Sequence, residues 1–184
     1  KGTVTYLAPL DKKQATVTIP ATATIDGVTY RVTAIEKNAF KNNRYIKRVI
    51  IGNNIITIGD DAFYGCKKLE NVNFGENVKI IGNKAFCKCV TLAKVTIPSK
   101  VKTIGKQAFY ACKKLKSATI GKGVAKIGSK ALYGCSKMKT LTIKSSKLTA
   151  KKIGSKAFSK TPKKMTVKVP KNTKVFINKC IRTT

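Results

Sequence analysis

Apolar positions recur along this chain with a fixed period. An Ala-Phe pair, with Leu in place of Phe in one copy, returns six times. The first five copies are 23 residues apart, and the sixth follows after 26. The pairs are Ala39-Phe40, Ala62-Phe63, Ala85-Phe86, Ala108-Phe109, Ala131-Leu132 and Ala157-Phe158. A period in this range predicts a solenoid, in which each repeat buries its apolar face only by stacking on its neighbours.

Smaller patterns within each repeat predict its local structure. Val95 and Ile97 alternate with polar residues, which is typical of a short strand with one buried face. Pro98 follows at once, and Gly or Pro takes this place in most copies, which ends the strand in a turn. The phrase G-x-x-A-F-x-x-C-x-x-L spaces apolar residues by three or four. It predicts a short helical or 3₁₀ turn, so the fold class is a mostly β solenoid of stacked parallel strands joined by such turns.

The N-terminal end departs from the repeat, as the end of a solenoid must. We expect residues 1–31 to form a cap of β-hairpins in front of the repeats, which occupy 32–170. In this cap, 4–7 is expected to pair with 16–19. The segment 23–30 predicts a second hairpin, because it turns at an Asp-Gly pair between alternating strands.

The C-terminal end is also irregular. Residues 166–170 predict the last strand, and 171–184 predict a C-terminal cap. Within the cap, 174–181 is expected to close the core as a helical turn or a strand. The three extra residues of the last repeat fall in 147–152, where we expect the coil to bulge.

The phrase I-G-x-x-A-F-x-x-C-x-x-L-x-x-V-x-I-P, which runs from Ile81 to Pro98, resembles the BspA-like leucine-rich repeat family. The resemblance extends over about residues 32–170, and the N-terminal hairpins are also similar to that family's usual cap. It implies a curved, right-handed leucine-rich-repeat coil of about six repeats from a bacterial surface or secreted protein, and hence an extracellular or cell-surface location. Some members of the family are adhesins for host matrix proteins. The family has no catalytic residues to place on this chain.

Length and hydropathy set the class of protein. The 184 residues suffice for one domain with a substantial core. No apolar run approaches the ~18 residues that cross a bilayer, so a membrane-spanning segment is not expected. The chain starts at Lys1 without a signal peptide, and we expect it to be a mature or trimmed piece of a longer product.

The charge of the chain is extreme and unevenly distributed. The formal net charge is +32, yet all seven Asp and Glu lie in the first 76 residues. Residues 77–184 hold 28 Lys and Arg and no carboxylate, which predicts salt-sensitive attraction of polyanions such as sulfated glycans, teichoic acids or nucleic acid. Lys outnumbers Arg 35 to 4, and Arg supplies the bidentate geometry that reads phosphates and bases. Specific nucleic-acid readout is therefore not expected, and keeping an exposed solenoid soluble is the alternative role of the lysines.

Four cysteines recur at one position of the repeat, and two do not. The recurring ones are Cys66, Cys89, Cys112 and Cys135. We expect them to point inward as small buried side chains with free thiols, with disulfides between neighbouring coils as the alternative. Cys87 and Cys180 are expected to be partly exposed. The sequence Cys87-Lys88-Cys89 lacks a His partner, so no metal site is expected there.

The sequence offers little catalytic chemistry. Histidine is absent, which excludes Ser-His, Cys-His and His-metal arrangements. Paired carboxylates could come only from Asp60-Asp61 or Glu70, and the glycines match no phosphate-binding loop. We therefore predict a non-enzyme with no cofactor.

Two surfaces remain as candidate binding sites, each of which could also be an ordinary solvated face. The first is the exposed face of the sheet, since solenoids commonly bind on such extended sheets. Its residues are Arg48, Asn71, Asn73, Lys94, Thr96, Ser117, Thr119, Thr140 and Thr142. The second is a lysine column near Tyr64, Tyr110 and Tyr133. Its residues are Lys68, Lys114, Lys137 and Lys163. We predict an interaction module that contacts a host or bacterial surface protein or glycan through the exposed sheet face. The alternatives are a polyanion binder that uses the lysine column and a structural spacer.

Overall fold

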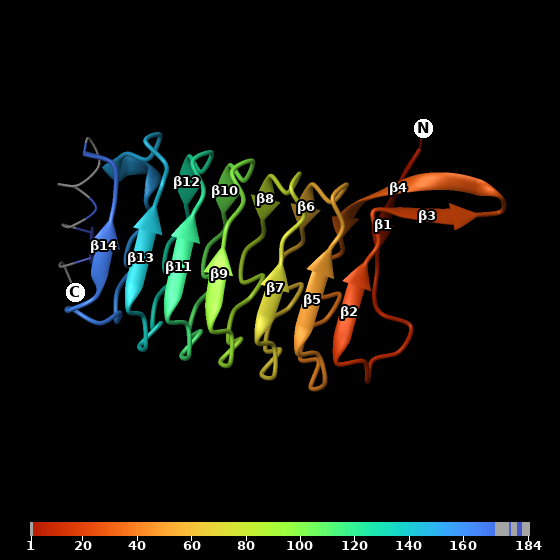
Figure 1. The fold of residues 1–184 in the computed structure, drawn as a ribbon, viewed down its shortest axis with the longest axis horizontal. Coiled ribbons are helices and arrows are strands. Elements are labelled where there is room, and N and C mark those ends of the chain that lie inside the picture. The colour runs from red at the N-terminus through yellow and green to blue at the C-terminus, as the bar shows by residue number, and fades with distance from the viewer. Residues whose placement is uncertain (1, 172–176, 178–179, 182–184) are drawn as a thin grey trace.

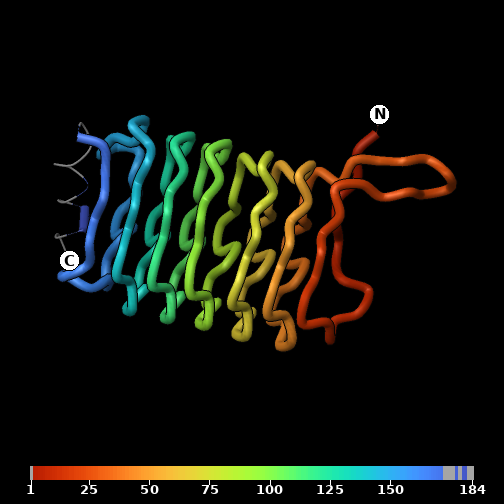
Figure 2. Tube along the Cα trace, in the orientation of Figure 1, coloured from red at the N-terminus to blue at the C-terminus, as the bar shows by residue number. Residues whose placement is uncertain are grey.

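The protein is a row of stacked coils (Figure 1). The computed structural model describes residues 2–171, 177, 180 and 181. The trace in Figure 2 follows the coils one after another, with a hairpin projecting from the N-terminal end. Among the described residues, no helix is long and apolar enough to cross a membrane.

Short strands supply most of the regular structure. The strands are β1 (Thr3–Tyr6), β2 (Thr16–Ile19), β3 (Thr22–Ile25), β4 (Val28–Ile35), β5 (Arg48–Ile51), β6 (Thr57–Ile58), β7 (Asn71–Asn73), β8 (Ile80–Ile81), β9 (Lys94–Thr96), β10 (Thr103–Ile104), β11 (Ser117–Ile120), β12 (Lys126–Ile127), β13 (Thr140–Ile143) and β14 (Thr166–Lys168). A 3₁₀ helix, η1 (Ala150–Lys152), lies in the predicted insertion, where Leu148 is buried.

The inner coils each contribute one strand to each of two layers (Figure 1), and the last coil continues the back layer only by a bridge from Ile127 to Ile153. The Val-x-Ile segments form the front strands β2, β5, β7, β9, β11, β13 and β14. The back sheet has the order β4-β6-β8-β10-β12, with β1 and β3 both paired to β4. From β6 on, its strands have two residues each and precede the Gly bend. In the back sheet Ile58 pairs with Ile81, Ile81 with Ile104 and Ile104 with Ile127, all parallel. The prediction of a parallel solenoid with a 23-residue repeat is therefore confirmed.

The Ala-Phe turns form a third ladder instead of continuous helical pieces. The N–H of Tyr64 does donate to the carbonyl of Asp61 three residues earlier, at 3.0 Å, as in a 3₁₀ turn. However, Asp61 and Gly65 adopt left-handed backbone angles, with φ of 54° and 69°, and these interrupt any helix. The N–H groups that they redirect bond to the next coil, as Gly65 does to the carbonyl of Cys87 at 2.8 Å. The spacing of apolar residues by three and four in the sequence therefore corresponds to a single turn in each coil, and not to a helix.

Aromatic side chains stack in the centre of the coils. Phe40, Phe63, Phe86 and Phe109 form a parallel stack with ring centroids 4.7, 5.0 and 5.3 Å apart. Tyr6 of the N-terminal cap continues the stack at 5.8 Å from Phe40. Ring stacking adds to the apolar burial of the four Phe side chains, which are almost fully buried. The core is thus a set of columns that run through all coils.

The N-terminal cap differs from the prediction in one of its two hairpins. The hairpin of β3 and β4 is confirmed, with Ile25 opposite Val28. The expected pairing of 4–7 with 16–19 is wrong, because β1 pairs in parallel with β4 and β2 in parallel with β5. These strands act as an incomplete first coil: Val17 and Ile19 are buried against the core, where they cover the apolar end of the stack.

At the C-terminal end, β14 confirms the predicted last strand and pairs with β13. Ile177 is helical and fully buried, and Cys180 is partly exposed as expected. The rest of the segment 174–181, for which a helical turn or strand was predicted, lies largely outside the described residues.

Candidate functional site

The front strands do not form one continuous sheet. They divide into a sheet of β2-β5-β7 and a sheet of β9-β11-β13-β14. Within the described residues, β7 and β9 share no strand ladder, although they belong to consecutive coils. One long hydrogen bond of 3.4 Å, from the N–H of Ala93 to the carbonyl of Glu70, links the two segments just before they begin. The back sheet continues across the same coils without a break.

Two residues distinguish this junction from the others. Phe74 lies where the neighbouring coils have Ile51 and Ile97, and its larger ring is only half-buried, edge-on to Phe86 at 5.6 Å. Pro98 occupies the position from which two other coils bond to the coil before them: Gly52 to the carbonyl of Ile19 at 2.8 Å and Lys144 to the carbonyl of Ile120 at 2.9 Å. Proline has no N–H, so the corresponding bond to the carbonyl of Phe74 cannot form.

The break opens a groove of about 510 Å³ on the front of the molecule. Its apolar floor includes Val72 and Phe74, both half-buried, whereas Val49 and Val95 at the Val72 position of adjacent coils are buried. The complete lining is Arg48, Ile50, Asn71, Val72, Asn73, Phe74, Lys94, Thr96 and Pro98. We call this cavity the front groove.

The groove gathers one part of the predicted sheet-face site and leaves out the rest. Arg48, Asn71, Asn73, Lys94 and Thr96 are exposed and line it. Ser117, Thr119, Thr140 and Thr142 lie instead on the continuous ladder between β11 and β13, where they are half-buried beside their neighbours. Val72 and Phe74 were not predicted as part of a site. The signal that could have found them is a Phe in the Ile column, followed one coil later by Pro98.

The chemistry of the front groove is that of a binding site. An accessible aromatic ring and a Val side chain provide apolar contact, and amide groups of two Asn provide both donors and acceptors. Arg48 and Lys94 add two permanent positive charges at its rim. The lining contains no thiol and no carboxylate, and its hydroxyl group, that of Thr96, has no base among the lining side chains that could activate it for catalysis.

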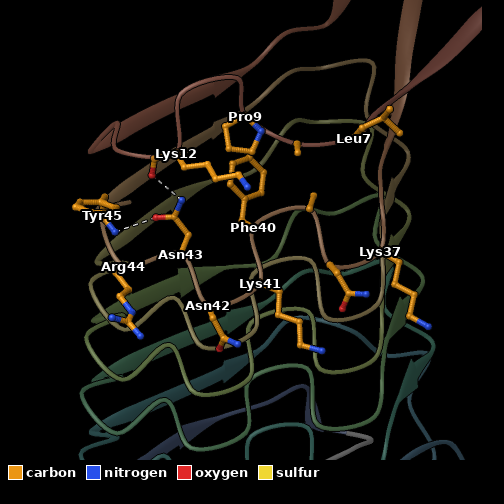
Figure 3. A pocket seen from close by; sticks show the side chains of 13 residues that line it. Leu7, Pro9, Lys12, Lys37, Phe40, Lys41, Asn42, Asn43, Arg44 and Tyr45 are labelled. Atoms are coloured by element: carbon orange, nitrogen blue, oxygen red, sulfur yellow. Dashed lines mark hydrogen bonds between the residues drawn. The ribbon is translucent and has the colours of Figure 1, made fainter.

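A second cavity, of about 460 Å³, lies at the N-terminal end of the coils (Figure 3). Pro9 covers the ring of Phe40, and the side-chain amide of Asn43 donates to the carbonyl of Lys12 at 2.9 Å, which holds the loop over the first coil. The side chains of Lys41 and Arg44 point away from the ring (Figure 3). The cavity is thus a gap under a loop whose charges do not converge, and it suits a ligand less well than the front groove.

The predicted lysine column is exposed but is not joined to the tyrosines. Lys68, Lys114, Lys137 and Lys163 all lie at the surface. Other lysines cover the rings: Lys41 and Lys88 lie 5.7 and 5.5 Å from the centroid of Tyr64, and Lys130 and Lys160 cover Tyr133. Tyr110 stacks on Tyr133 at 5.2 Å. A hydrogen bond to Tyr64 raises the pKa of Lys88 above its usual value.

The cysteines have structural surroundings. Cys66, Cys89, Cys112 and Cys135 are buried as predicted, and each thiol donates to the carbonyl of the Phe one coil earlier, at 3.1 to 3.3 Å. The expectation that Cys87 is partly exposed is wrong: it is 3% exposed, because its short side chain lies at a position where the flanking coils carry Tyr64 and Tyr110. Burial raises the pKa of Cys66 to about 12 and that of Cys87 to about 11. These thiols are therefore poor nucleophiles. Within residues 2–171, 177, 180 and 181, no group of three or more His, Cys, Asp or Glu could hold a metal ion.

Comparison with known proteins agrees with this architecture. A family model described as a BspA-type leucine-rich repeat region matches residues 33–163 in six copies. The chain belongs to the BspA-type leucine-rich repeat family. No curated protein sequence matches this BspA-type chain significantly.

Solved structures with similar folds are bacterial leucine-rich repeat proteins and a pneumococcal vaccine antigen. The T. pallidum leucine-rich repeat protein TpLRR is 24% identical with a TM-score of 0.69, and the match covers 94% of this chain and 86% of that one. A leucine-rich cell surface protein from Faecalibacterium prausnitzii is 27% identical with a TM-score of 0.60, covering 88% of this chain and 48% of that one. The pneumococcal vaccine antigen PcpA is 20% identical with a TM-score of 0.70, covering 95% and 42%. The BspA-type chain thus spans less than half the length of the last two proteins.

Residues that recur in several coils can be distinguished from residues that occur in one coil of this chain. The Gly, Ala-Phe and Cys columns of this BspA-type solenoid recur in several coils and are explained by stacking. Phe74 occurs in this column in one coil, and with Pro98 it lines the front groove. The groove is therefore a property of this chain rather than of its repeat.

Proposed function

We propose that this BspA-type solenoid is a non-catalytic interaction module, secreted or displayed on a bacterial surface, that contacts a protein or glycan partner through its front strands. The likeness to a leucine-rich cell surface protein and to a vaccine antigen supports the location. Family membership supports a role in binding, because solenoids of this kind present extended surfaces to partners.

The front groove is the observation that carries the proposal. Binding energy at interfaces concentrates in a few side chains that enter well-shaped pockets, often beside Arg and aromatic groups. The groove offers such a pocket, with Phe74 in its floor and Arg48 and Lys94 at its rim. It fits a partner segment that presents an apolar group next to a carboxylate, or a sugar ring that stacks on the aromatic ring and bonds the Asn amides.

The test is binding to an array of extracellular-matrix proteins and neutral glycans at 300 mM salt, where diffuse attraction to the basic surface is screened. The variant Arg48→Gln/Lys94→Gln is expected to lower the affinity for the captured ligand by about tenfold or more, because it removes the rim charges and leaves the floor intact. Phe74→Ile is expected to do the same, since it removes the aromatic floor.

The matched control is Lys79→Gln/Lys102→Gln, which removes the same charge from exposed lysines beside the back sheet. It is expected to change affinity by less than about twofold. The proposal is overturned if no ligand is retained at 300 mM salt, or if the control weakens binding as much as the groove variant does.

A further inference from the structure

A second surface lies along the turns that lead into the last front strands, β11, β13 and β14. These turns carry exposed lysines in every one of the last three coils. The lysines are Lys113, Lys114, Lys137, Lys139, Lys163 and Lys164, which we call the basic edge. The last carboxylate in the sequence is Glu76, so no acidic side chain of these coils can neutralise them.

The backbone holds this edge at a regular spacing. The N–H of Lys116 bonds to the carbonyl of Ala93, that of Lys139 to the carbonyl of Lys116 and that of Thr166 to the carbonyl of Lys139, each at 2.8 Å. Parallel strands bonded in this way lie about 4.8 Å apart. Lys114, Lys137 and Lys163 occupy equivalent positions of these three coils, so they form one row on a backbone that needs no ordering when a ligand binds.

A cavity of about 320 Å³ interrupts the edge between the last two coils. Lys137, Lys139 and Lys164 surround it, and Met138 and Met165 contribute an apolar wall. Met138 is buried and Met165 half-buried, so the wall is fixed by the core. The cavity thus combines three positive charges with an apolar surface, an arrangement that suits an acidic sugar ring with polar edges and C–H faces.

Hydroxyl groups border the same edge. Ser117 and Thr140 follow Lys116 and Lys139 directly and pair with each other on adjacent strands. Both are half-buried, which leaves part of each side chain accessible. They can exchange hydrogen bonds with sugar hydroxyl groups next to the lysine rows.

We propose that the basic edge binds a linear polysaccharide that carries sulfate or carboxylate groups, with one sugar unit in the cavity beside Lys139. Charge complementarity supplies the attraction, and the row of Lys114, Lys137 and Lys163 across consecutive coils matches a polymer with repeated anionic groups. Nucleic acid fits less well. The edge has no Arg for bidentate phosphate contacts and no aromatic side chain for base stacking. This proposal is independent of the front groove, which lies on other coils.

The test measures binding to immobilised heparin oligosaccharide, with dextran, single-stranded DNA and duplex DNA as comparison ligands. If about four cations are engaged, the affinity for heparin is expected to fall about 100-fold between 50 and 200 mM salt. The variant Lys114→Gln/Lys137→Gln/Lys139→Gln/Lys164→Gln is expected to bind about tenfold or more weakly at 100 mM salt.

The control variant is Lys102→Gln/Lys106→Gln/Lys122→Gln/Lys126→Gln, which removes four exposed lysines from the back sheet and its bends. It keeps the same net charge as the first variant and is expected to lose about twofold or less. Equal losses in the two variants would show a diffuse field and overturn the proposal. Tight binding of dextran would also overturn the proposal. The same holds if either DNA binds with the affinity of heparin and depends on the edge lysines to the same degree.

Discussion

The thiol of Cys112 donates a hydrogen bond of 3.2 Å to the carbonyl oxygen of Phe86, which lies one coil earlier. The same bond joins Cys66 to Phe40, Cys89 to Phe63 and Cys135 to Phe109. In the first and last coils, Asn43 and Thr161 take the cysteine position and bond within or beside their own coil. The cysteine column therefore acts as side-chain rungs between inner coils, which explains a thiol at this site without any redox role.

The first prediction concerns one such rung. Cys112→Ala removes the thiol donor and leaves a small void at a fully buried site. We expect the free energy of unfolding in urea to fall by about 1–3 kcal/mol. Ser136→Ala, at an exposed turn, is the control and should stay within about 0.5 kcal/mol of the parent protein. A Cys112→Ala protein as stable as this control would contradict the structural role of the rung.

The second prediction is a loss of stability at high pH. Burial raises the pKa of Cys66 and Cys135 from 9.0 to about 12. Above pH 9 the unfolded chain releases these thiol protons while the folded chain retains them, so ionisation favours the unfolded state. The stabilisation is complete below pH 9 and is lost as pH rises from 9 towards 12, by at most about 1.4 kcal/mol per pH unit for each thiol.

Urea unfolding at pH 8, 9 and 10 under reducing conditions measures this effect. The parent protein should lose stability more steeply above pH 9 than the variant Cys66→Ala/Cys135→Ala. Lysine titration is common to both proteins and cancels in the comparison. Identical slopes would mean that the two thiols ionise alike in the folded and unfolded chains.

The third prediction tests the aromatic stack. Phe109→Ala should lower the free energy of unfolding by about 3–5 kcal/mol, because Phe109 is 1% exposed and lies 5.3 Å from the ring of Phe86. Phe109→Leu should cost much less, about 1–1.5 kcal/mol, since the next coil already accommodates Leu132 in the same column. Chemical denaturation followed by circular dichroism gives both values, and a similar cost for the two changes would rule out a volume effect.

The fourth prediction concerns the bend of each coil. A Cβ atom on Gly105 would lie 2.6 Å from the backbone nitrogen of Asn83 in the preceding coil. Gly105→Ala must push two coils apart, and we expect a loss of about 1–3 kcal/mol. The exposed neighbour Lys106→Ala is the control and should have little effect. Thermal unfolding of the three proteins would detect the difference, and a neutral Gly105→Ala would show that the coils are less tightly stacked there.

The fifth prediction closes the front groove. Phe74→Ile with Pro98→Gly restores the usual side chain of the column and supplies the missing N–H donor. The amide introduced at position 98 should bond to the carbonyl of residue 74 and exchange its hydrogen slowly, as buried ladder amides do. Hydrogen exchange measured by NMR tests whether this bond forms. If the amide at position 98 exchanges as fast as an exposed amide, Phe74 and Pro98 do not cause the break.

The repeat could be predicted from sequence because the same constraint acts in every coil. Phe63, Phe86 and Phe109 are each needed to fill one column, so their spacing reports the fold directly. The role of β2 was less visible, although Val17-Thr18-Ile19-Pro20 repeats the pattern of Val95-Thr96-Ile97-Pro98. Sequence patterns predict a hairpin strand for this segment, because two alternating segments close in sequence favour antiparallel pairing. Stacking on the first coil outweighs that local preference.

The candidate site was only half predictable. Period-two alternation correctly placed Arg48, Asn71 and Lys94 on the exposed face of the strands. It could not show that Phe74 would remain accessible, because the same alternation assigns it to the core. Accessibility depends on how two neighbouring coils fit together, which a single repeat does not specify. The burial of Cys87 escaped prediction for the same reason, since it depends on the larger side chains in adjacent coils.

The interrupted front ladder also has a mechanical meaning. At the coils of β7 and β9 the back sheet and the Ala-Phe ladder are continuous, while the front strands share no ladder. Just before these strands, one long backbone hydrogen bond and the Thr91 hydroxyl, which lies 2.8 and 2.9 Å from the carbonyls of Lys67 and Leu69, link the two coils. Resistance to bending is therefore lowest on one side of one junction, and the rod should flex there about its back sheet as a one-sided hinge. A ligand wedged between Arg48 and Lys94 would stiffen that hinge, so occupancy of the groove would be registered as a change in the curvature of the whole solenoid.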